Sequence, residues 1–204
     1  AMPTGDGRVA RDAPAASNGD HPSRQHVLDH TEQVQVVMGG RSITRDDPDR
    51  EALDVVNHVL GGGLSSRLFD EIRERRGLAY SVFSTTMCYS DAGAWSVAAG
   101  TLPDHAAEVE GLIVRELDRL TAEGITDDEL DIAQGYLAGA YEMGLEDSGA
   151  RMSRLGAQLV VRDELIGVDE QLAKWRAVDH DDVRRVIDRV YGAASPLTVT
   201  VGPG

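Results

Sequence analysis

Apolar residues recur along this chain with two periods, and each period predicts one type of secondary structure. Val34, Val36 and Met38 alternate with polar neighbours, which is typical of a strand with one buried face. Trp95 and Val97 continue the same kind of alternation farther along the chain. On this basis the first strand contains Val34, and the other strands cover residues 78–87, 94–101 and 197–201.

Repeats of three and four residues predict helices between these strands. Asp47 can cap the first of them, and Pro48 suits its first position. Thr126 and Glu129 form the sequence pattern of a capping box, and Gly77 is placed to end a helix. The helices predicted in this way cover residues 48–60, 64–76, 103–124, 126–141, 149–162, 168–177 and 181–191.

The order of these elements indicates an α+β fold. Strands at the start, middle and end of the ordered chain most simply meet in one sheet, with helices packed against it. We therefore expect a two-layer domain over residues 26–204, with an antiparallel or mixed sheet covered by helices. Residues 1–25 are rich in Gly, Asp, Ala, Pro and Ser and have no apolar periodicity, so they are expected to be a flexible linker or a cloning remnant.

The charge of the chain limits the classes of partner that it can bind. It carries 35 acidic and 20 basic residues, a formal net charge of −15. This charge repels phosphate backbones and anionic lipid, so we expect neither nucleic acid nor a membrane as partner. Peptides carrying Lys or Arg would be attracted, but a solvated surface explains the charge more simply and needs no ligand. Cys88 is the single cysteine, which excludes an internal disulfide, and the start has no signal-peptide core, so we expect a cytoplasmic protein.

Several familiar catalytic motifs are absent. The Gly61–Gly63 run is not followed by the Gly-Lys-Ser/Thr of a phosphate-binding loop, so a tight turn between helices explains it better. The six histidines form neither a His-Glu-x-x-His nor a His-x-x-Glu-His string, and there is no Gly-x-Ser-x-Gly nucleophile elbow. No metal-binding residues are therefore predicted in this chain, and it offers no self-sufficient catalytic constellation.

Basic residues concentrate between Gly61 and Tyr80, in the stretch GGGLSSRLFDEIRERRGLAY. Nearby carboxylates nearly cancel the four arginines, so a helix surface linked by salt bridges is one interpretation. The other interpretation is functional. Arg73 lies in the last helical turn and Tyr80 just after the turn at Gly77, so both donors can reach one end of the sheet and bind a peptide carbonyl oxygen.

This stretch resembles the C-terminal domain of pitrilysin/insulinase-type zinc metallopeptidases, particularly the branch that includes mitochondrial processing peptidase. The segments that carry the resemblance are Leu60–Phe69, Glu71–Glu74, Arg76–Val82, Gly144–Ser148 and Arg151–Gly156. The resemblance extends over about residues 30–201.

The resemblance implies one half of a clamshell that closes around a peptide. The other, N-terminal half or subunit would bind Zn²⁺ through His-x-x-Glu-His, and there zinc and a glutamate would activate water. In this half, Arg73 and Tyr80 match an arginine and a tyrosine that reach the substrate. Both are therefore expected to bind substrate, and Tyr80 is also expected to be catalytic by donating to the carbonyl oxygen. This chain alone is expected to be inactive.

Two other functions stay open. Relatives of this fold also serve as non-catalytic partner subunits or scaffolds, and an intact zinc motif upstream would favour the enzyme over the scaffold. A small-ligand-binding α+β domain is supported only by the general fold pattern. The sequence also leaves open a homo-oligomer, the peptide specificity, and whether the parent enzyme is one chain or two.

Overall fold

Five strands form one mixed sheet in the computed structural model, which describes residues 23–192 and 196–203. β1 runs parallel to β5, and the other neighbouring strands run antiparallel. The strands lie in the order β1-β5-β2-β4-β3, and their bounds are β1 Arg24–Leu28, β2 Val34–Ser42, β3 Ala79–Cys88, β4 Gly93–Thr101 and β5 Leu197–Gly202. The predicted α+β fold is thus confirmed.

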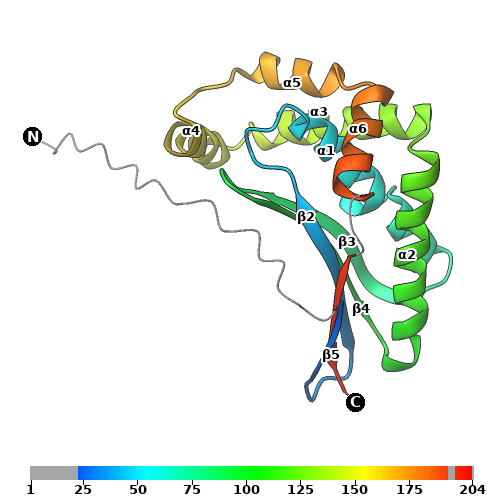
Figure 1. Cartoon of the computed structure of the whole chain (residues 1–204). Helices are drawn as coiled ribbons and strands as arrows, with labels where there is room; N and C mark the ends of the chain where they lie inside the picture. Colours follow the sequence, from blue (N-terminus) through cyan, green and yellow to red (C-terminus); the bar gives the residue numbers. More distant parts are fainter. Residues whose placement is uncertain (1–22, 193–195, 204) are drawn as a thin grey trace, which may run out of the picture.

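The helices gather on one face of this sheet, as Figure 1 shows for α1, α2 and α6. Helices α3 and α5 form an outer layer that contacts α1. Helix α4 lies apart from them, near the end of the β3–β4 hairpin. The helices are α1 Arg50–Asn57, α2 Ala106–Glu123, α3 Asp127–Gly144, α4 Ser148–Arg162, α5 Val168–Arg176 and α6 His180–Val190. Shorter helical turns are η1 His58–Gly62, η2 Phe69–Glu74 and η3 Pro103–His105. Among the described helices, none combines the length and apolar character needed to cross a membrane.

The main core lies between the sheet and the helices that cover it. The predicted alternation is confirmed, because Val36 and Met38 of β2 and Val97 of β4 are fully buried on the helix side. Leu53 of α1 and Ile187 of α6 belong to the same buried cluster and cover these strand residues. The apolar periodicity of the sequence therefore identified the covered face of the sheet correctly.

Some helix ends differ from the prediction. The capping box of Thr126 and Glu129 is confirmed at the start of α3. The first helix, however, begins at Arg50 and not at Pro48, because the Asp47 carboxylate accepts the backbone N–H of Asp49 (3.0 Å) and closes a turn before the helix. The helix predicted for residues 64–76 is reduced to η2, since the chain turns at 63–66 before it winds up again.

The sequence did not reveal β1. All five of its residues are exposed, so it has no apolar pattern, and it is held by parallel pairing with β5. Arg24 and Gln25, which the sequence assigned to the linker, are its first two residues. The remainder of the predicted linker, residues 1–22, lies outside the described residues.

A buried carboxylate joins α1 to α6. Asp49 is only 3% exposed, and it accepts hydrogen bonds from Arg185 (2.6 and 2.9 Å) and from Arg189. Arg189 also donates to Asp47 at 2.7 Å, and this hydrogen bond lowers the pKa of the Asp47 carboxyl although partial burial opposes the shift. Two arginines of α6 are thus tied to the segment that starts α1.

We expect Asp49→Asn to destabilise the fold, because a buried carboxylate between two guanidinium groups loses its charge. The cost should be on the order of 1–3 kcal/mol, below the usual value for a broken buried ion pair because both arginine heads reach solvent. Asp188→Asn is the control, since Asp188 pairs with Arg184 on an exposed helix surface and should change stability by less than about 0.5 kcal/mol. Urea unfolding of the three proteins measures the difference, and equal midpoints would contradict a structural role for Asp49.

Candidate functional site

The Gly61–Gly63 turn packs directly on β3 and sets where the following segment begins. A Cβ on Gly61 would lie 2.6 Å from the backbone nitrogen of Ser84, so only glycine fits there. The Ser84 hydroxyl donates to the backbone oxygen of Asn57 (2.9 Å) and ties β3 to the end of α1. The glycines therefore serve a tight turn between helical segments, as the sequence predicted.

The turn at Gly77 places Arg73 beside Tyr80. Ile72, fully buried, anchors η2 in the core, and Arg73 is the next residue. The backbone N–H of Gly77 donates to the carbonyl of Arg73 (3.0 Å), and Gly77 adopts φ +64°, a left-handed conformation that favours glycine. This reversal starts β3 at Ala79, one residue before Tyr80.

A β-bulge turns Tyr80 outward. Ala79 pairs with Thr101 and Ser81 pairs with Gly100, so Tyr80 is the extra residue between them. The bulge shifts the alternation by one residue, which lets Ala79 and Val82 both be buried while Tyr80 stays exposed. Bulges of this kind commonly redirect a side chain next to a functional site.

Arg73 and Tyr80 are in contact in the structure. The Arg73 guanidinium carbon lies 5.3 Å from the centre of the Tyr80 ring and 4.8 Å from that of Phe69, so it stacks between two aromatic rings. Tyr80 is 79% exposed, and its hydroxyl forms no hydrogen bond within the described part of the chain. The pair thus presents unused donors on an exposed surface at the start of β3.

The other arginines of this segment pair with carboxylates. Arg67 donates to Glu129 (2.6 and 2.7 Å), Arg75 pairs with Asp70 (2.8 Å) and Arg76 with Glu71 (2.6 Å). The interpretation as a salt-bridged surface therefore fits these three arginines. Arg73 forms no ion pair with any carboxylate in residues 23–192 or 196–203 and is distinguished from them.

These ion pairs shift the pKa of two glutamates. The hydrogen bond from Arg76 lowers the pKa of the Glu71 carboxyl. Burial raises the pKa of Glu129, but the bonds from Arg67 and from the Thr126 backbone outweigh it and the net pKa is lowered. Both carboxylates are therefore charged at neutral pH, and they neutralise the positive charges of Arg67 and Arg76.

Histidine and cysteine side chains do not assemble a metal site in the residues that the structure describes. No group of three His, Cys, Asp or Glu side chains there could hold a metal ion, so these residues do not fit zinc. His58 is buried, and its ring stacks on Tyr136 with centroids 4.2 Å apart; burial lowers its pKa. Burial also raises the pKa of the partly buried Cys88 thiol, which disfavours the thiolate nucleophile.

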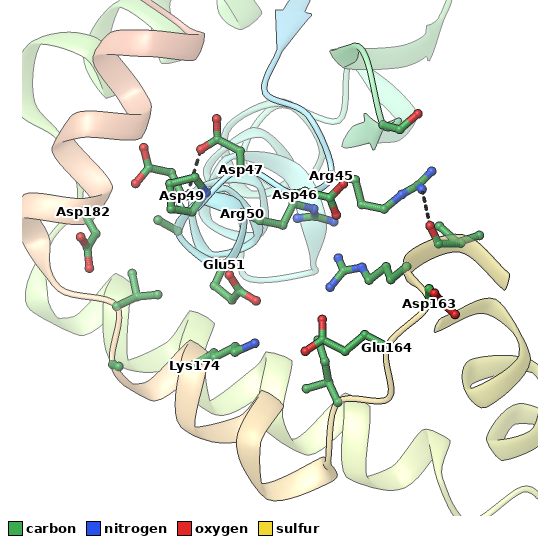
Figure 2. A pocket seen from close by; sticks show the side chains of 18 of the residues that line it. Arg45, Asp46, Asp47, Asp49, Arg50, Glu51, Asp163, Glu164, Lys174 and Asp182 are labelled. Atoms are coloured by element: carbon green, nitrogen blue, oxygen red, sulfur yellow. Dashed lines mark hydrogen bonds between the residues drawn. The ribbon is translucent and has the colours of Figure 1, made fainter. Parts of the chain in front are cut away.

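A large hollow of about 1220 Å³ lies elsewhere, between the start of α1 and the loop after α4 (Figure 2). Sequence reasoning did not identify it, because its charged residues come from segments more than 100 positions apart. Residues of both signs line it, among them Asp46, Glu51, Glu164 and Lys174. Because the two signs are mixed, the hollow does not select one ligand charge, and neither Arg73 nor Tyr80 lines it.

Comparison with known families gives a match over most of the chain. Residues 10–137 match the family model described as the peptidase M16 inactive domain. The chain is 44% identical over 173 residues to an uncharacterized zinc protease of Streptomyces coelicolor, which covers 85% of this chain and 38% of that protein. An uncharacterized zinc protease of Mycobacterium tuberculosis is 42% identical over 167 residues, which covers 80% of this chain and again 38% of that protein.

Solved structures give the same picture. A peptidase M16 inactive domain from Pseudomonas fluorescens superposes with a TM-score of 0.79 at 26% identity, over 89% of this chain and 43% of that chain. A protease from Helicobacter pylori superposes with a TM-score of 0.79 at 25% identity, over 88% of this chain and 44% of that chain. This chain therefore spans well under half of the length of these relatives.

We expect Gly77→Ala to destabilise the fold by about 1–2 kcal/mol, because alanine is strained at positive φ. A Cβ there would meet nothing within 4 Å, so the cost is purely one of backbone conformation. Gly135→Ala is the matched control: its Cβ also meets nothing, but it lies within α3, so the change should stabilise by up to about 1 kcal/mol. Chemical denaturation should give opposite signs for the two variants, and the same sign for both would contradict this account of the turn.

Proposed function

Because this chain belongs to the peptidase M16 inactive-domain family, we propose that it is the substrate-binding half of a zinc metalloendopeptidase of the mitochondrial-processing-peptidase-like branch. The zinc would lie on a second half or subunit, outside this chain. Two findings support this division: relatives are named zinc proteases and are more than twice as long, and the described residues hold no group suited to a metal. Zinc would supply a Lewis acid to the reaction.

The contact between Arg73 and Tyr80 is the observation that carries the proposal. In an otherwise salt-bridged segment, Arg73 stacks on Tyr80 at 5.3 Å, and no described carboxylate neutralises it. Such a pair is poorly explained as surface stabilisation, because an exposed phenol without a hydrogen-bond partner contributes little to folding. It is well explained as a pair of donors held ready for a ligand.

Each donor has a distinct task in this proposal. The Tyr80 hydroxyl donates to the carbonyl oxygen of the scissile peptide and stabilises the negative charge that develops there. The Arg73 guanidinium holds the Tyr80 ring by stacking, and its N–H groups bind peptide carbonyls. Because Arg73 is itself stacked on Phe69, the pair is oriented before substrate arrives.

The substrate class follows from the charge of the chain. A peptide bound between two halves in a closed chamber would meet a protein with a formal charge of −15, so peptides that carry Lys or Arg would be attracted. The alternative function is that of a non-catalytic partner or scaffold subunit. That function does not require Arg73 and Tyr80 to keep their donors free. Kinetics of the assembled enzyme distinguish the catalytic function from the scaffold function.

We expect Tyr80→Phe in the full-length parent enzyme to lower kcat by roughly 10²-fold or more, with a smaller effect on KM. The ring and its stacking on Arg73 remain, so the thermal melt should barely change. Steady-state kinetics beside the melt decide the matter. Wild-type turnover in a normally folded variant would remove the catalytic role from Tyr80.

Arg73→Ala should raise KM as well as lower kcat, because it removes both the peptide donor and the support of the Tyr80 ring. Arg76→Ala is the matched control, since Arg76 lies in the same segment but is occupied by Glu71. That variant should keep both constants within about twofold of wild type. Equal effects of the two variants would show that general charge, and not the contact with Tyr80, matters here.

The chain alone should bind no stoichiometric zinc tightly and should hydrolyse no peptide, because its described residues hold no suitable ligand group. Metal analysis after dialysis and a peptide cleavage assay measure both properties. About one zinc per chain would place the metal in this half and contradict the proposed division of labour.

A further inference from the structure

The last glycine of the run Gly61–Gly63 is fitted to the ring of His58. If Gly63 carried a Cβ, the three atoms nearest to it would all belong to that imidazole, and the closest of them, Cε1, would be 2.6 Å away. The backbone of Gly63 is extended (φ −157°, ψ 176°), a conformation that any residue adopts. The need for glycine at this position therefore comes from the His58 ring and not from the backbone.

Helix α3 holds the same turn at two points. The His58 ring stacks on Tyr136, with the ring planes inclined by 20°. Beyond the turn, Arg67 is bound by Glu129. Tyr136 and Glu129 are seven residues apart, which is about two turns of a helix, so they lie on one side of α3. The chain before Gly63 and the chain after it are thus fastened to the same side of one helix.

Hydrogen bonds connect Gly63 to the segment that carries Arg73. The backbone N–H of Ser66 (3.2 Å) and its hydroxyl (2.6 Å) both donate to the backbone oxygen of Gly63. The backbone oxygen of Ser66 in turn accepts the N–H of Asp70 (3.0 Å), in the first turn of η2. Because η2 also contains Arg73, a displacement of Gly63 would displace the guanidinium group that stacks on Tyr80.

The surroundings of His58 suit a neutral ring only. His58 is 4% exposed, and its Nε2 is buried without a hydrogen-bond partner among the described residues. A protonated imidazole carries an N–H on both nitrogens and a full positive charge, and burying a charge without a partner is costly. Protonation of His58 therefore conflicts with the packing of the ring against Gly63 and Tyr136.

The elements packed around η1 supply no charge that offsets a proton on His58. Three of them contribute a carboxylate that is at least partly buried: Asp54 of α1, Glu116 of α2 and Glu129 of α3. A nearby arginine lowers the pKa of each of these carboxyls, whereas burial alone accounts for the lowered pKa of His58. Strand β3 has no acidic or basic residue, and Tyr136 is the titratable group that stacks on the ring.

We propose that His58 is a positioning residue for the Arg73–Tyr80 pair: its neutral ring holds the Gly61–Gly63 turn in place, and its protonation releases the turn and the pair with it. This role rests on the proposed function of the pair and adds a limit to activity at acid pH. Because burial lowers the pKa of His58, the folded chain binds this proton less readily than the unfolded chain. The stabilisation by the neutral ring is complete above about pH 6.5, the ordinary pKa of histidine, and is lost as the pH falls toward the pKa of the folded state.

A double-mutant cycle in the chain itself tests the contact between His58 and Gly63 without catalysis. Gly63→Ala should lower the midpoint of urea unfolding by roughly 0.5 M or more, because the new Cβ meets the His58 ring. In a His58→Ala background the same change should shift the midpoint far less, because the ring is gone. Gly111→Ala, in α2, is the matched control: its Cβ meets nothing within 4 Å, so its effect should be the same in both backgrounds. An equal loss for Gly63→Ala in the two backgrounds would overturn the contact.

A pH titration of the chain by NMR tests the release of the turn. Between about pH 8 and pH 5, the His58 ring should titrate with a midpoint below about 6.5, and the backbone amides of Gly63 and Arg73 should shift with the same midpoint. In His58→Gln, whose side chain cannot be protonated, both amide transitions should disappear. Amides that stay unchanged while the ring titrates would overturn the release, and so would a ring that stays neutral over the whole range.

The pH profile of the full-length parent enzyme tests the effect on activity. As His58 gains its proton, kcat/KM should fall by up to about tenfold per pH unit. His58→Gln should move this fall to lower pH by about half a unit or more and keep kcat/KM at about pH 8 within about threefold of wild type. His180→Gln is the control and should leave the profile unchanged, because His180 is exposed and bound to Asp127 (2.7 Å). Identical profiles for His58→Gln and wild type would remove His58 from the pH dependence.

The role of His58 and the proposed function fail separately. If Tyr80→Phe keeps wild-type turnover, the proposed function is lost, while the double-mutant cycle and the NMR titration still report whether His58 holds the turn. If Tyr80→Phe is impaired and the amides of Gly63 and Arg73 do not follow His58, only the role of His58 is lost.

Discussion

The constraint on which this structure depends is that the sheet is covered on one face only. Val36, Met38 and Val97 bury one side of the sheet under α1, α2 and α6 and form the main core. The opposite side has no such cover within residues 23–192 and 196–203. Arg73 and Tyr80 lie where β3 begins, at the rim of this sheet, and the helix layer on the covered face holds the strand in place.

The same constraint explains how Tyr80 becomes available. In a regular strand side chains alternate between the two faces, so Tyr80 and Val82, two residues apart, would lie on the same side and Tyr80 would point toward the core. The bulge beside Ala79 breaks this rule, so β3 keeps its apolar residues in the core and still projects Tyr80 toward Arg73. Arg73, the other residue of the contact, is held by its neighbours in the chain. Ile72 is buried in the core on one side of it, and the turn at Gly77 follows on the other, so its backbone has little freedom.

Sequence patterns predicted those parts of the molecule that are governed by local chemistry or by burial. The capping box at Thr126, the turn at Gly77 and the strands of the covered face all belong to this group. Strand β1 could not be predicted, because its residues are exposed and its partner β5 lies about 170 positions away. The bounds of α4 were close to those predicted, yet its orientation depends on Arg154 reaching Tyr141 and Ile166 in three dimensions. For the same reason, sequence brought Arg73 and Tyr80 together but could not show which neighbouring arginines are neutralised.

Scarcity of aromatic residues makes their placement informative. The chain has only two phenylalanines, and an aromatic ring normally adds most when it is buried. Neither ring lies in the main core: Phe69 stacks on Arg73, and Phe83 is exposed on the face of the sheet away from the helices. The core is instead packed with aliphatic side chains around Trp95 and Tyr191. Both phenylalanines therefore lie where they add little to the packing of the core, and Phe69 instead supports the contact between Arg73 and Tyr80.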